Sequence, residues 1–208
     1  MKGMRKIVCE GYEKGNYAST FRVGKVLTEF ERQFFDCFLT LLPRAPQIVD
    51  FGCGIGVPYD KYLVEHGCIV TGLDICRKHI SQAKRNIPEA KYLEVDFTSW
   101  EPNVKFDAVV SLFAIFHIPR REHQVLFRKI AETLGNDGVL LCTLATHEIQ
   151  EDERDWLGAP MVWSSYAPDF YIDTLEKLGF YIAKSDFEGR PGDEEHHLWL
   201  IAQKANAL

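Results

Sequence analysis

The stretch IVDFGCGIGVP, residues 48–58, restricts the fold of this chain more than any other segment. An apolar run ends in Asp50, and glycines follow at positions 52, 54 and 56. Glycine has no side chain and adopts backbone angles that other residues avoid, so such a turn lets the backbone approach a ligand closely. The pattern predicts a buried strand, a glycine turn and a helix. A tight strand–helix turn without a ligand is the alternative interpretation.

Apolar strands and amphipathic helices alternate along most of the chain. Strands are predicted at 47–51, 68–74, 91–97, 106–114 and 139–145, and helices at 22–42, 57–66, 76–87, 119–134 and 171–180. Strands that are apolar almost throughout suit a sheet covered on both faces, and the alternation indicates a parallel α/β sheet. Two further runs, 181–187 and 196–204, flank a short polar turn with Gly and Pro and form a hairpin. The final strand is therefore expected to run antiparallel to its neighbours.

Composition and charge disfavour several classes of protein. The chain has 208 residues, 46% of them hydrophobic, and a net charge of −6, which suits one domain with a sizeable core. No dense Lys/Arg run is present, so nucleic-acid binding is not expected. No segment approaches the roughly 18 apolar residues of a membrane span, and the first residues lack the apolar core of a signal peptide. Six scattered cysteines without a C-x-x-C pair indicate reduced thiols, a cytoplasmic location and no metal site.

Two acids end the second and third predicted strands. Asp74 lies 22 residues after Gly52, where an acid can accept hydrogen bonds from ribose hydroxyls. Asp96 could accept from an adenine amino group, or it could cap the next turn. Together the glycines and the two acids predict an adenosyl pocket. A dinucleotide fingerprint would place a glycine at position 57, which is Val57, so the spacing speaks against NAD or FAD.

These segments resemble the class I S-adenosylmethionine-dependent methyltransferase family over nearly the whole chain. VDFGCGIG is similar to the family's first motif, VTGLDI to its second, LEVDF to its third and FDAVVSLFAIFHIPR to its fourth-strand motif. LGNDGVLLCT is similar to the turn into the fifth strand, although Asn136 and Asp137 replace the usual Pro-Gly. The resemblance implies an α/β fold, a Rossmann-like three-layer sandwich. Its seven-stranded sheet would be mostly parallel, with the last strand antiparallel.

The resemblance also implies a cofactor, S-adenosyl-L-methionine, with S-adenosyl-L-homocysteine as its product. The first motif would meet the methionine part of the cofactor, the second the ribose and the third the adenine. Phe113 would pack against the cofactor and Tyr17 would cover its methionine end; core packing and a surface tyrosine are the alternatives. The residues implied by the three motifs are Asp50, Gly52, Cys53, Gly54, Asp74, Ile75, Asp96 and Phe97.

Methyl transfer is an in-line displacement, which a protein can promote mainly by holding donor and acceptor together. A base is needed only where the acceptor must lose a proton early. His117, just past the fourth strand, is the candidate base, because imidazole accepts protons near neutral pH. A structural histidine is the alternative. His197 could reach the same place from the last strand or lie buried in the sheet.

Residues 146–168 make a long connection for a compact domain, and such loops are usually functional or disordered. Aromatic residues in this segment and near the N-terminus predict the walls of an acceptor pocket, with plain loop anchors as the alternative. The candidates are Tyr12, Trp156, Trp163 and Tyr166. We expect a small-molecule acceptor that is flat or apolar, and a monomer or homodimer.

We expect a single methyltransferase domain over residues 1–208. It divides into an N-terminal cap and helix (1–45), a cofactor-binding core (46–145), an acceptor-side loop (146–168), and a helix with a terminal β-hairpin (169–208). Two other functions remain as alternatives. One is a cofactor-binding subunit or sensor without catalysis, and the other is a nicotinamide-dependent dehydrogenase, which the glycine spacing disfavours.

Overall fold

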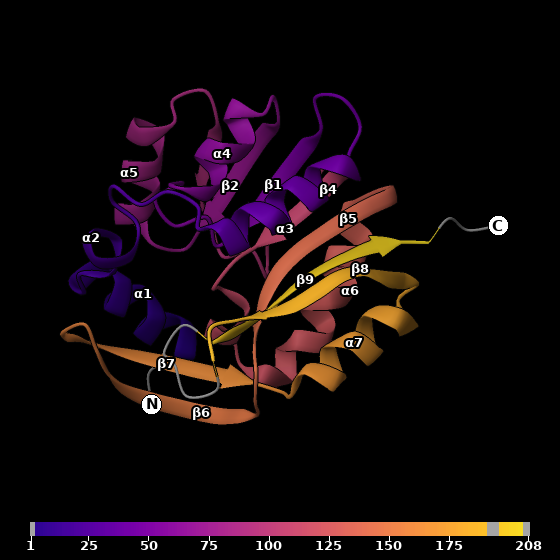
Figure 1. Cartoon of the computed structure of the whole chain (residues 1–208). Coiled ribbons are helices and arrows are strands. Elements are labelled where there is room, and N and C mark those ends of the chain that lie inside the picture. Colours follow the sequence, from indigo (N-terminus) through magenta and orange to yellow (C-terminus); the bar gives the residue numbers. More distant parts are fainter. Residues whose placement is uncertain (1–2, 191–195, 206–208) are drawn as a thin grey trace.

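A seven-stranded sheet forms the centre of the molecule (Figure 1) in a computed structural model that describes residues 3–190 and 196–205. The strand order is β3-β2-β1-β4-β5-β9-β8, and β9 runs antiparallel to both of its neighbours while the other pairs are parallel. The predicted fold class and the antiparallel last strand are confirmed. The strands are β1 (Gln47–Phe51), β2 (Ile69–Asp74), β3 (Lys91–Glu94), β4 (Phe106–Ser111), β5 (Leu134–Ala145), β8 (Phe180–Glu188) and β9 (His197–Lys204).

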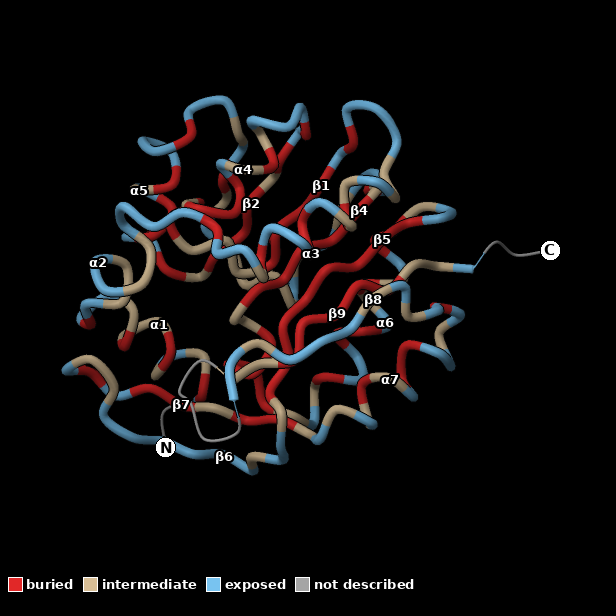
Figure 2. The backbone as a smooth tube through the Cα atoms, in the orientation of Figure 1, coloured by how far each residue is buried: buried red, intermediate tan, exposed pale blue. Residues whose placement is uncertain are grey.

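Helices cover both faces of the sheet, as the continuous apolar strands require. Alternate residues of β1 point to opposite faces: Val49 packs in the core under α6 and α7, and Ile48 packs in the core under α3 and α4. Buried backbone runs through the central strands in Figure 2, while the helices expose their outer faces. The helices are α3 (Glu29–Thr40), α4 (Tyr59–Glu65) and α5 (Arg77–Asn86) on one side, and α6 (His123–Thr133) and α7 (Pro168–Lys177) on the other.

The strand order reverses between β1 and β4, which lie side by side in the sheet. From β1 the chain proceeds outward to β2 and β3, and from β4 it proceeds outward to β5. Ligands of open α/β sheets bind beyond the carboxyl ends of the strands at such a reversal. The glycine turn follows β1 at this point, so the topology places it where a ligand site is expected.

A smaller layer lies beyond that edge of the sheet (Figure 1). Its helix α1 packs against strand β7 through Met4, Val8, Met161 and Val162. At Gly11 a Cβ atom would lie 2.4 Å from the carbonyl oxygen of Pro160, so only glycine permits this close approach. The elements of this layer, which we call the cover, are α1 (Met4–Lys14), α2 (Tyr17–Phe21), β6 (Ile149–Trp156) and β7 (Ala159–Ser165).

The cover differs from what the sequence predicts. Residues 149–165 form an antiparallel β-hairpin, β6–β7, in place of an irregular loop. The acidic run on β6 faces solvent along its whole length. Because charged residues are depleted in strands, its sequence pattern did not predict a strand. The helices α1 and α2 were not predicted either. The polar turn predicted between β8 and β9 lies largely outside the described residues.

The helix predicted at 22–42 begins only at Glu29 because a capping box fixes its start. The Thr28 hydroxyl accepts a hydrogen bond from the backbone N–H of Glu31 (3.2 Å), and the Glu31 carboxylate accepts one from the backbone N–H of Thr28 (2.6 Å). Val23 and Val26, whose spacing suggested an apolar helix face, are instead 59% and 78% exposed before the helix.

Two further expectations concern the chain as a whole. All six cysteines are free thiols, as their spacing predicts. Within the described ranges, no helix combines the length and apolar character needed to cross a membrane.

Candidate active site

The glycine turn after β1 has the geometry that its sequence predicts. Gly52 has a φ of +89°, which L-residues with side chains rarely adopt. A Cβ atom at this position would lie 2.4 Å from the Cβ of Ala114. The backbone N–H groups of Gly52 and Cys53 both donate to the carbonyl oxygen of Leu73 (2.8 and 3.0 Å), so the turn is fastened to the end of β2.

Asp74 ties the glycine turn to the start of α5. One carboxylate oxygen accepts from the backbone N–H of Gly54 (2.9 Å) and the other from that of Cys76 (2.7 Å). The Nδ1 atom of His79 lies 3.5 Å from the same carboxylate and is buried without a hydrogen-bond partner. Because a carboxylate offers about four lone-pair directions, Asp74 retains acceptor capacity toward the cavity that it lines.

A pair of buried carboxyl groups lies beneath the turn. Asp50 and Asp60 are almost fully buried, and the Asp60 carboxylate accepts from the Tyr92 hydroxyl (3.0 Å). Burial, followed by repulsion from Asp60, raises the pKa of Asp50 well above its usual range. Burial also raises the pKa of Asp60 to about 7. Since two such close groups do not both ionise readily, the pair retains a proton at neutral pH.

Asp96, the acid expected beside the adenine, is engaged by a residue that the sequence did not indicate. Its carboxylate forms an ion pair with the Nε atom of Arg5 (2.5 Å) and accepts from the backbone N–H of Thr98 (2.9 Å). Arg5 also pairs with Glu122 (2.5 Å). Helix α1 is thereby fastened across the β3 end of the cavity.

The glycine turn, Asp74 and Asp96 line a first cavity of about 70 Å³ under α1, which we call the inner cavity. It joins the glycine turn to the ends of β2, β3 and β4. Arg5, Tyr12 and Tyr17 reach it from the cover. Of the predicted cofactor residues, the inner cavity brings together Gly52, Gly54, Asp74, Ile75, Asp96, Phe97, Phe113 and Tyr17.

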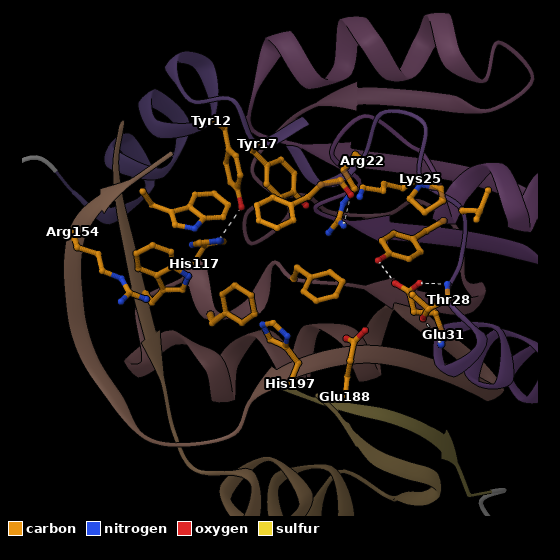
Figure 3. Close-up of a pocket in the computed structure, with 18 of the residues that line it drawn as sticks. Tyr12, Tyr17, Arg22, Lys25, Thr28, Glu31, His117, Arg154, Glu188 and His197 are labelled. Carbon is orange, nitrogen blue, oxygen red and sulfur yellow. Dashed lines mark hydrogen bonds between the residues drawn. The ribbon is translucent and has the colours of Figure 1, made fainter. Parts of the chain in front are cut away.

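A second cavity of about 360 Å³, the outer cavity, opens beside the first (Figure 3). Eight of its nineteen described lining residues are Phe, Tyr or Trp, and they come from α1, α2, α4, the hairpin and the segment after β4. Phe21 stacks on Trp156 with ring centroids 5.8 Å apart, and Trp156 meets Trp163 edge to face at 5.9 Å. The residues that border both cavities are Tyr12, Tyr17, Phe113 and His117.

Comparison with known proteins identifies the domain. Residues 48–138 match the family model described as a methyltransferase domain. The fold matches a crystal structure of a SAM-dependent methyltransferase from Methanosarcina mazei with a TM-score of 0.71 and 16% identity, over 88% of this chain and 100% of that one. The chain carries a class I S-adenosylmethionine-dependent methyltransferase domain. The predicted cofactor, S-adenosylmethionine with S-adenosylhomocysteine as product, is therefore confirmed for the family of this domain.

Two curated relatives show how varied proteins with this domain are. A trans-aconitate 2-methyltransferase of Escherichia fergusonii is 25% identical over 67% of this chain and 60% of its own length. An S-adenosyl-L-methionine-dependent Diels-Alderase of Talaromyces variabilis is 30% identical over 51% of this chain and 39% of its own length. The chain thus spans 60% and 39% of the lengths of these two curated relatives, less than two thirds of either.

His117 connects the methyltransferase core to the cover on both of its ring nitrogens. Nδ1 lies 2.9 Å from the carbonyl oxygen of Val162 on β7, and Nε2 lies 2.9 Å from the hydroxyl of Tyr12 on α1. A carbonyl oxygen only accepts, so Nδ1 carries the hydrogen and Nε2 accepts from the tyrosine. Burial lowers the pKa of His117 to about 4. His117 is therefore neutral at physiological pH.

The structure does not bring every predicted residue of the methyltransferase site to a cavity. Tyr166 stacks on Phe170, with ring centroids 3.9 Å apart, and lies under Arg120. It is absent from the described walls of both cavities, in contrast to Tyr12, Trp156 and Trp163. Asp50 and Cys53 lie behind the glycine turn and not on the cavity surface.

Several lining residues of the methyltransferase domain escaped the sequence analysis. Arg5 lies in α1 and Arg22 directly follows α2, and neither segment carries a motif, so no signal indicated them. His79 lies on α5, one helical turn after Cys76 and outside the second motif, which ends at Ile75. The sequence allowed His197 to be either a site residue or a buried residue of the sheet, and in the structure it lines the outer cavity from the start of β9.

A buried group of possible metal ligands adjoins the cofactor cavity of the domain. Asp74, Cys76 and His79 place ligand atoms within 4.8 Å of one another. However, Asp74 already accepts two backbone hydrogen bonds. Burial raises the pKa of the Cys76 thiol far above its usual value, so the thiolate that a metal prefers is disfavoured. We therefore assign no metal to this group.

Proposed function

We propose that this chain transfers the methyl group of S-adenosylmethionine to a flat, largely apolar small molecule held in the outer cavity. The observation that carries this proposal is the junction of the two cavities at Tyr12, Tyr17, Phe113 and His117. The inner cavity holds about 70 Å³, less than the roughly 300 Å³ that a ligand of this size needs, so we propose that the cover shifts outward as the cofactor enters. The bound cofactor would then present its sulfonium methyl at that junction. An acceptor in the outer cavity would meet the methyl there, shielded from water by the cover.

The proposed cofactor contacts follow from the walls of the inner cavity. The bare backbone at Gly52 and Gly54 suits the methionine part, which must pass close to the chain. Asp74, with Ile75 beside it, would accept from the ribose hydroxyls. Asp96 and Phe97 would hold the adenine, with Arg5 kept at the rim by its second ion pair to Glu122.

The walls of the outer cavity support a flat acceptor more than a highly charged one. Aromatic rings favour stacking on planar groups. The charged side chains offset one another, because three cations and three acids share the wall, so a polycarboxylate such as trans-aconitate has no excess of positive charge to bind. The charged lining residues are Arg22, Lys25, Arg154, Glu31, Asp155 and Glu188.

The proposed chemistry rests mainly on orientation. Holding two reactants in an in-line geometry contributes on the order of 7–11 kcal/mol of barrier reduction. His117 is a weak base, because its pKa is lowered to about 4 by burial. We propose that it orients Tyr12 toward the acceptor and takes up a proton only as the methyl bond forms. An acceptor that is nucleophilic without prior deprotonation fits this site best.

The proposal treats residues 1–208 as one functional unit, a monomer or homodimer that acts without nucleic acid or membrane. Within it, the N-terminal helices and the β6–β7 hairpin form a movable cover over the acceptor. Their packing on each other supports a common motion, because α1 and β7 share one small apolar cluster. Covering segments that open and close exclude water from the reaction.

A methyl-transfer assay tests the proposal. The protein is incubated with S-adenosylmethionine labelled in the methyl group and a panel of planar phenols, heteroaromatic amines and aromatic carboxylates, and labelled product is separated by chromatography. We expect S-adenosylhomocysteine to bind in calorimetry and label to appear in at least one planar acceptor. Binding without transfer to any acceptor would favour a protein that only holds the cofactor. Preferential binding of a nicotinamide nucleotide would contradict the assignment.

A further inference from the structure

We propose that Thr143 is a positioning residue: its hydroxyl holds Phe113 in a strained backbone conformation, so that the Phe113 ring limits the size of the group that the cofactor can carry on its sulfur. The inference rests on the proposed function, which places the sulfonium methyl at the junction of the two cavities. Phe113 borders both cavities. Thr143 lies in β5 and lines neither cavity in the described part of the chain, so any effect it has on ligands passes through its neighbours.

Phe113 has a backbone conformation that is unfavourable for its residue type. Its φ is +57°, in the left-handed region that bulky side chains rarely adopt. Strained conformations of this kind cluster at functional sites, and they persist only where the surrounding contacts hold them in place. The strain therefore points to a requirement on where the Phe113 side chain lies.

Three contacts hold the turn that contains Phe113. The backbone N–H of Phe113 donates to the hydroxyl of Thr143 (2.6 Å), which is fully buried. The Ser111 hydroxyl donates to the last carbonyl group of β1 (2.9 Å). Ala114 fits against the bare backbone of Gly52, where a Cβ atom would lie 2.4 Å from its own. The first of these contacts acts on the strained residue itself, and the other two hold its neighbours.

The Thr143 hydroxyl takes the place of a backbone partner. The ladder between β4 and β5 ends at the pair Ser111 and Cys142, so the N–H group of Phe113 lies beyond it and bonds to a side chain instead. A buried N–H group without an acceptor is costly. Valine has nearly the shape of threonine but no acceptor, so Thr143→Val would leave this N–H group unpartnered and favour relaxation of the turn.

The Phe113 ring is packed among residues of the core. It stacks on Tyr59 of α4 with ring centroids 6.2 Å apart, and it meets Trp199 and His197 of β9 edge to face at 5.9 and 4.9 Å. The guanidinium carbon of Arg22 lies 4.9 Å from the ring centroid. A ring packed in this way has little room to move aside for a ligand.

The other three residues that border both cavities are tied to the cover. Tyr12 and Tyr17 lie on α1 and α2, and His117 bonds to Tyr12 and to β7. An outward shift of the cover would therefore change their positions, whereas Phe113 would stay with the sheet. Phe113 is thus the fixed wall of the junction, and a substituent on sulfur that is larger than methyl would collide with it.

The experiment measures how affinity depends on the size of the group on sulfur. Calorimetry compares S-adenosylmethionine with its analogues in which ethyl or n-propyl replaces the methyl group, and with S-adenosylhomocysteine, which lacks such a group. Thr143→Val removes the acceptor, Thr143→Ser retains it, and Phe113→Ala removes the ring. Thr174→Val is the matched control, because Thr174 is also buried and hydrogen-bonded but lies in α7, away from the described walls of both cavities. Thermal melts establish that each variant is folded.

The wild type should bind the propyl analogue at least about tenfold more weakly than S-adenosylmethionine, as expected for extra methylene groups in a fitted pocket. In Phe113→Ala this ratio should fall to about twofold, because the space left by the ring accepts the longer chain. Thr143→Val should lower the ratio to about threefold and leave S-adenosylhomocysteine affinity within about threefold, since only the turn relaxes. Thr143→Ser and Thr174→Val should keep the wild-type ratio. A general loss of stability would weaken all the ligands alike and leave the ratio unchanged.

Two measurements report on the Phe113 backbone directly. Its amide should exchange slowly in the wild type and in Thr143→Ser, and about tenfold faster or more in Thr143→Val, which lacks the hydrogen-bond acceptor. Phe113→Gly should melt at a higher temperature than Phe113→Ala, because glycine adopts a φ of +57° without strain. Where φ is negative, the order of these two variants is the reverse.

The inference is overturned if the wild type binds the propyl analogue as tightly as S-adenosylmethionine, or if the ratio persists in Phe113→Ala, because the ring then limits nothing. It is also overturned if Thr143→Val keeps either the wild-type ratio or the slow exchange of the Phe113 amide. A lower melting temperature for Phe113→Gly than for Phe113→Ala would show that the backbone is not strained. A wild-type protein that binds neither S-adenosylmethionine nor S-adenosylhomocysteine contradicts the proposed function itself, which separates the two failures.

Discussion

The cofactor edge of the sheet and the cover above it are built in different ways. The edge consists of backbone turns at the ends of β1, β2 and β4, held by the parallel sheet and by hydrogen bonds such as that from Gly52 to Leu73. The cover meets the core through side chains from segments far apart in the chain, such as Tyr12 of α1 and His117 of the core. The comparison teaches that backbone geometry shapes much of the inner cavity, whereas side chains, many of them aromatic, shape the outer one.

The two regions also differ in how firmly they are held. The sheet is packed between two large apolar cores. The cover has one small cluster of buried residues, Met4, Val8, Met161 and Val162, and a few polar links to the core. Regions with few buried apolar contacts open at a lower free-energy cost than a protein's core. The cover is therefore expected to open while the cofactor edge stays intact.

The largest effect is expected from Gly52→Ala. The new Cβ would meet Ala114 at 2.4 Å, and the φ of +89° is strained for alanine. We expect S-adenosylhomocysteine affinity to fall more than a hundredfold and the free energy of unfolding to fall by more than the roughly 1–2 kcal/mol of backbone strain alone. The control is Gly67→Ala, which has a φ of +82° but open space around its Cβ. Equal, small effects in calorimetry and chemical unfolding would refute the backbone account.

Asp74→Ala should produce the next largest effect. The carboxylate is the proposed ribose acceptor, and a hydrogen bond to a charged group contributes about 1.5–3 kcal/mol, so affinity for S-adenosylhomocysteine should fall roughly ten- to a hundredfold. Some of this loss will come from loosening Gly54, whose N–H bonds to the same carboxylate. Asp36→Ala, on the surface of α3, is the control. An unchanged calorimetric affinity in the folded variant would show that the acid is not a cofactor ligand.

Trp163→Ala tests the cover. Trp163 lines the outer cavity but not the inner one. Turnover or acceptor affinity should therefore fall about tenfold, while S-adenosylhomocysteine affinity stays within a few-fold. Trp163→Phe, which keeps an aromatic face, should recover part of the loss. Hydrogen exchange in α1 and β6–β7 should slow when S-adenosylhomocysteine is added. Full protection of both segments without ligand would instead mean that Trp156 and Trp163 are ordinary core residues.

The smallest effect concerns pH. Burial lowers the pKa of His117 to about 4, against about 6.5 when the ring is released to solvent. As pH falls, His117 in the unfolded chain binds a proton before His117 in the folded protein does. The contribution of neutral, buried His117 to the free energy of unfolding is therefore complete above pH 6.5 and is lost between pH 6.5 and 4. Since His123 has a similarly lowered pKa, both histidines contribute in this window.

The measurement is the melting temperature of the wild type, His117→Gln and His123→Gln from pH 7.5 to 4.5. Between pH 7.5 and 4.5, the melting temperature of each variant should fall less than that of the wild type. Only His117→Gln should also flatten the pH dependence of hydrogen exchange in α1 and β7, because His117 alone of the two bonds to both. Parallel pH curves for all three proteins would contradict the proposed role of His117 in closing the cover.

Much of the cofactor edge could be predicted because its determinants are local. A buried strand, a glycine turn and an acid at the end of the next strand each occupy a few consecutive residues, and the inner cavity indeed contains Gly52, Gly54, Asp74 and Asp96. The cover was predicted less well. Three of the four predicted aromatic residues line a cavity, but Tyr166 stacks on Phe170 of α7, and residues predicted as a loop form the charged strand β6.

By itself, the sequence determined the α/β architecture, the antiparallel last strand and the glycine turn at the sheet edge, because apolar periodicity and glycine backbone angles are set by residues close together in the chain. Only the tertiary structure decided which side chains from the cover meet the edge of the sheet. Arg5 reaches Asp96, and Tyr12 reaches His117 across 105 residues of chain. Such contacts depend on how α1 packs against the hairpin, and this packing joins surfaces from distant parts of the chain that no local pattern specifies.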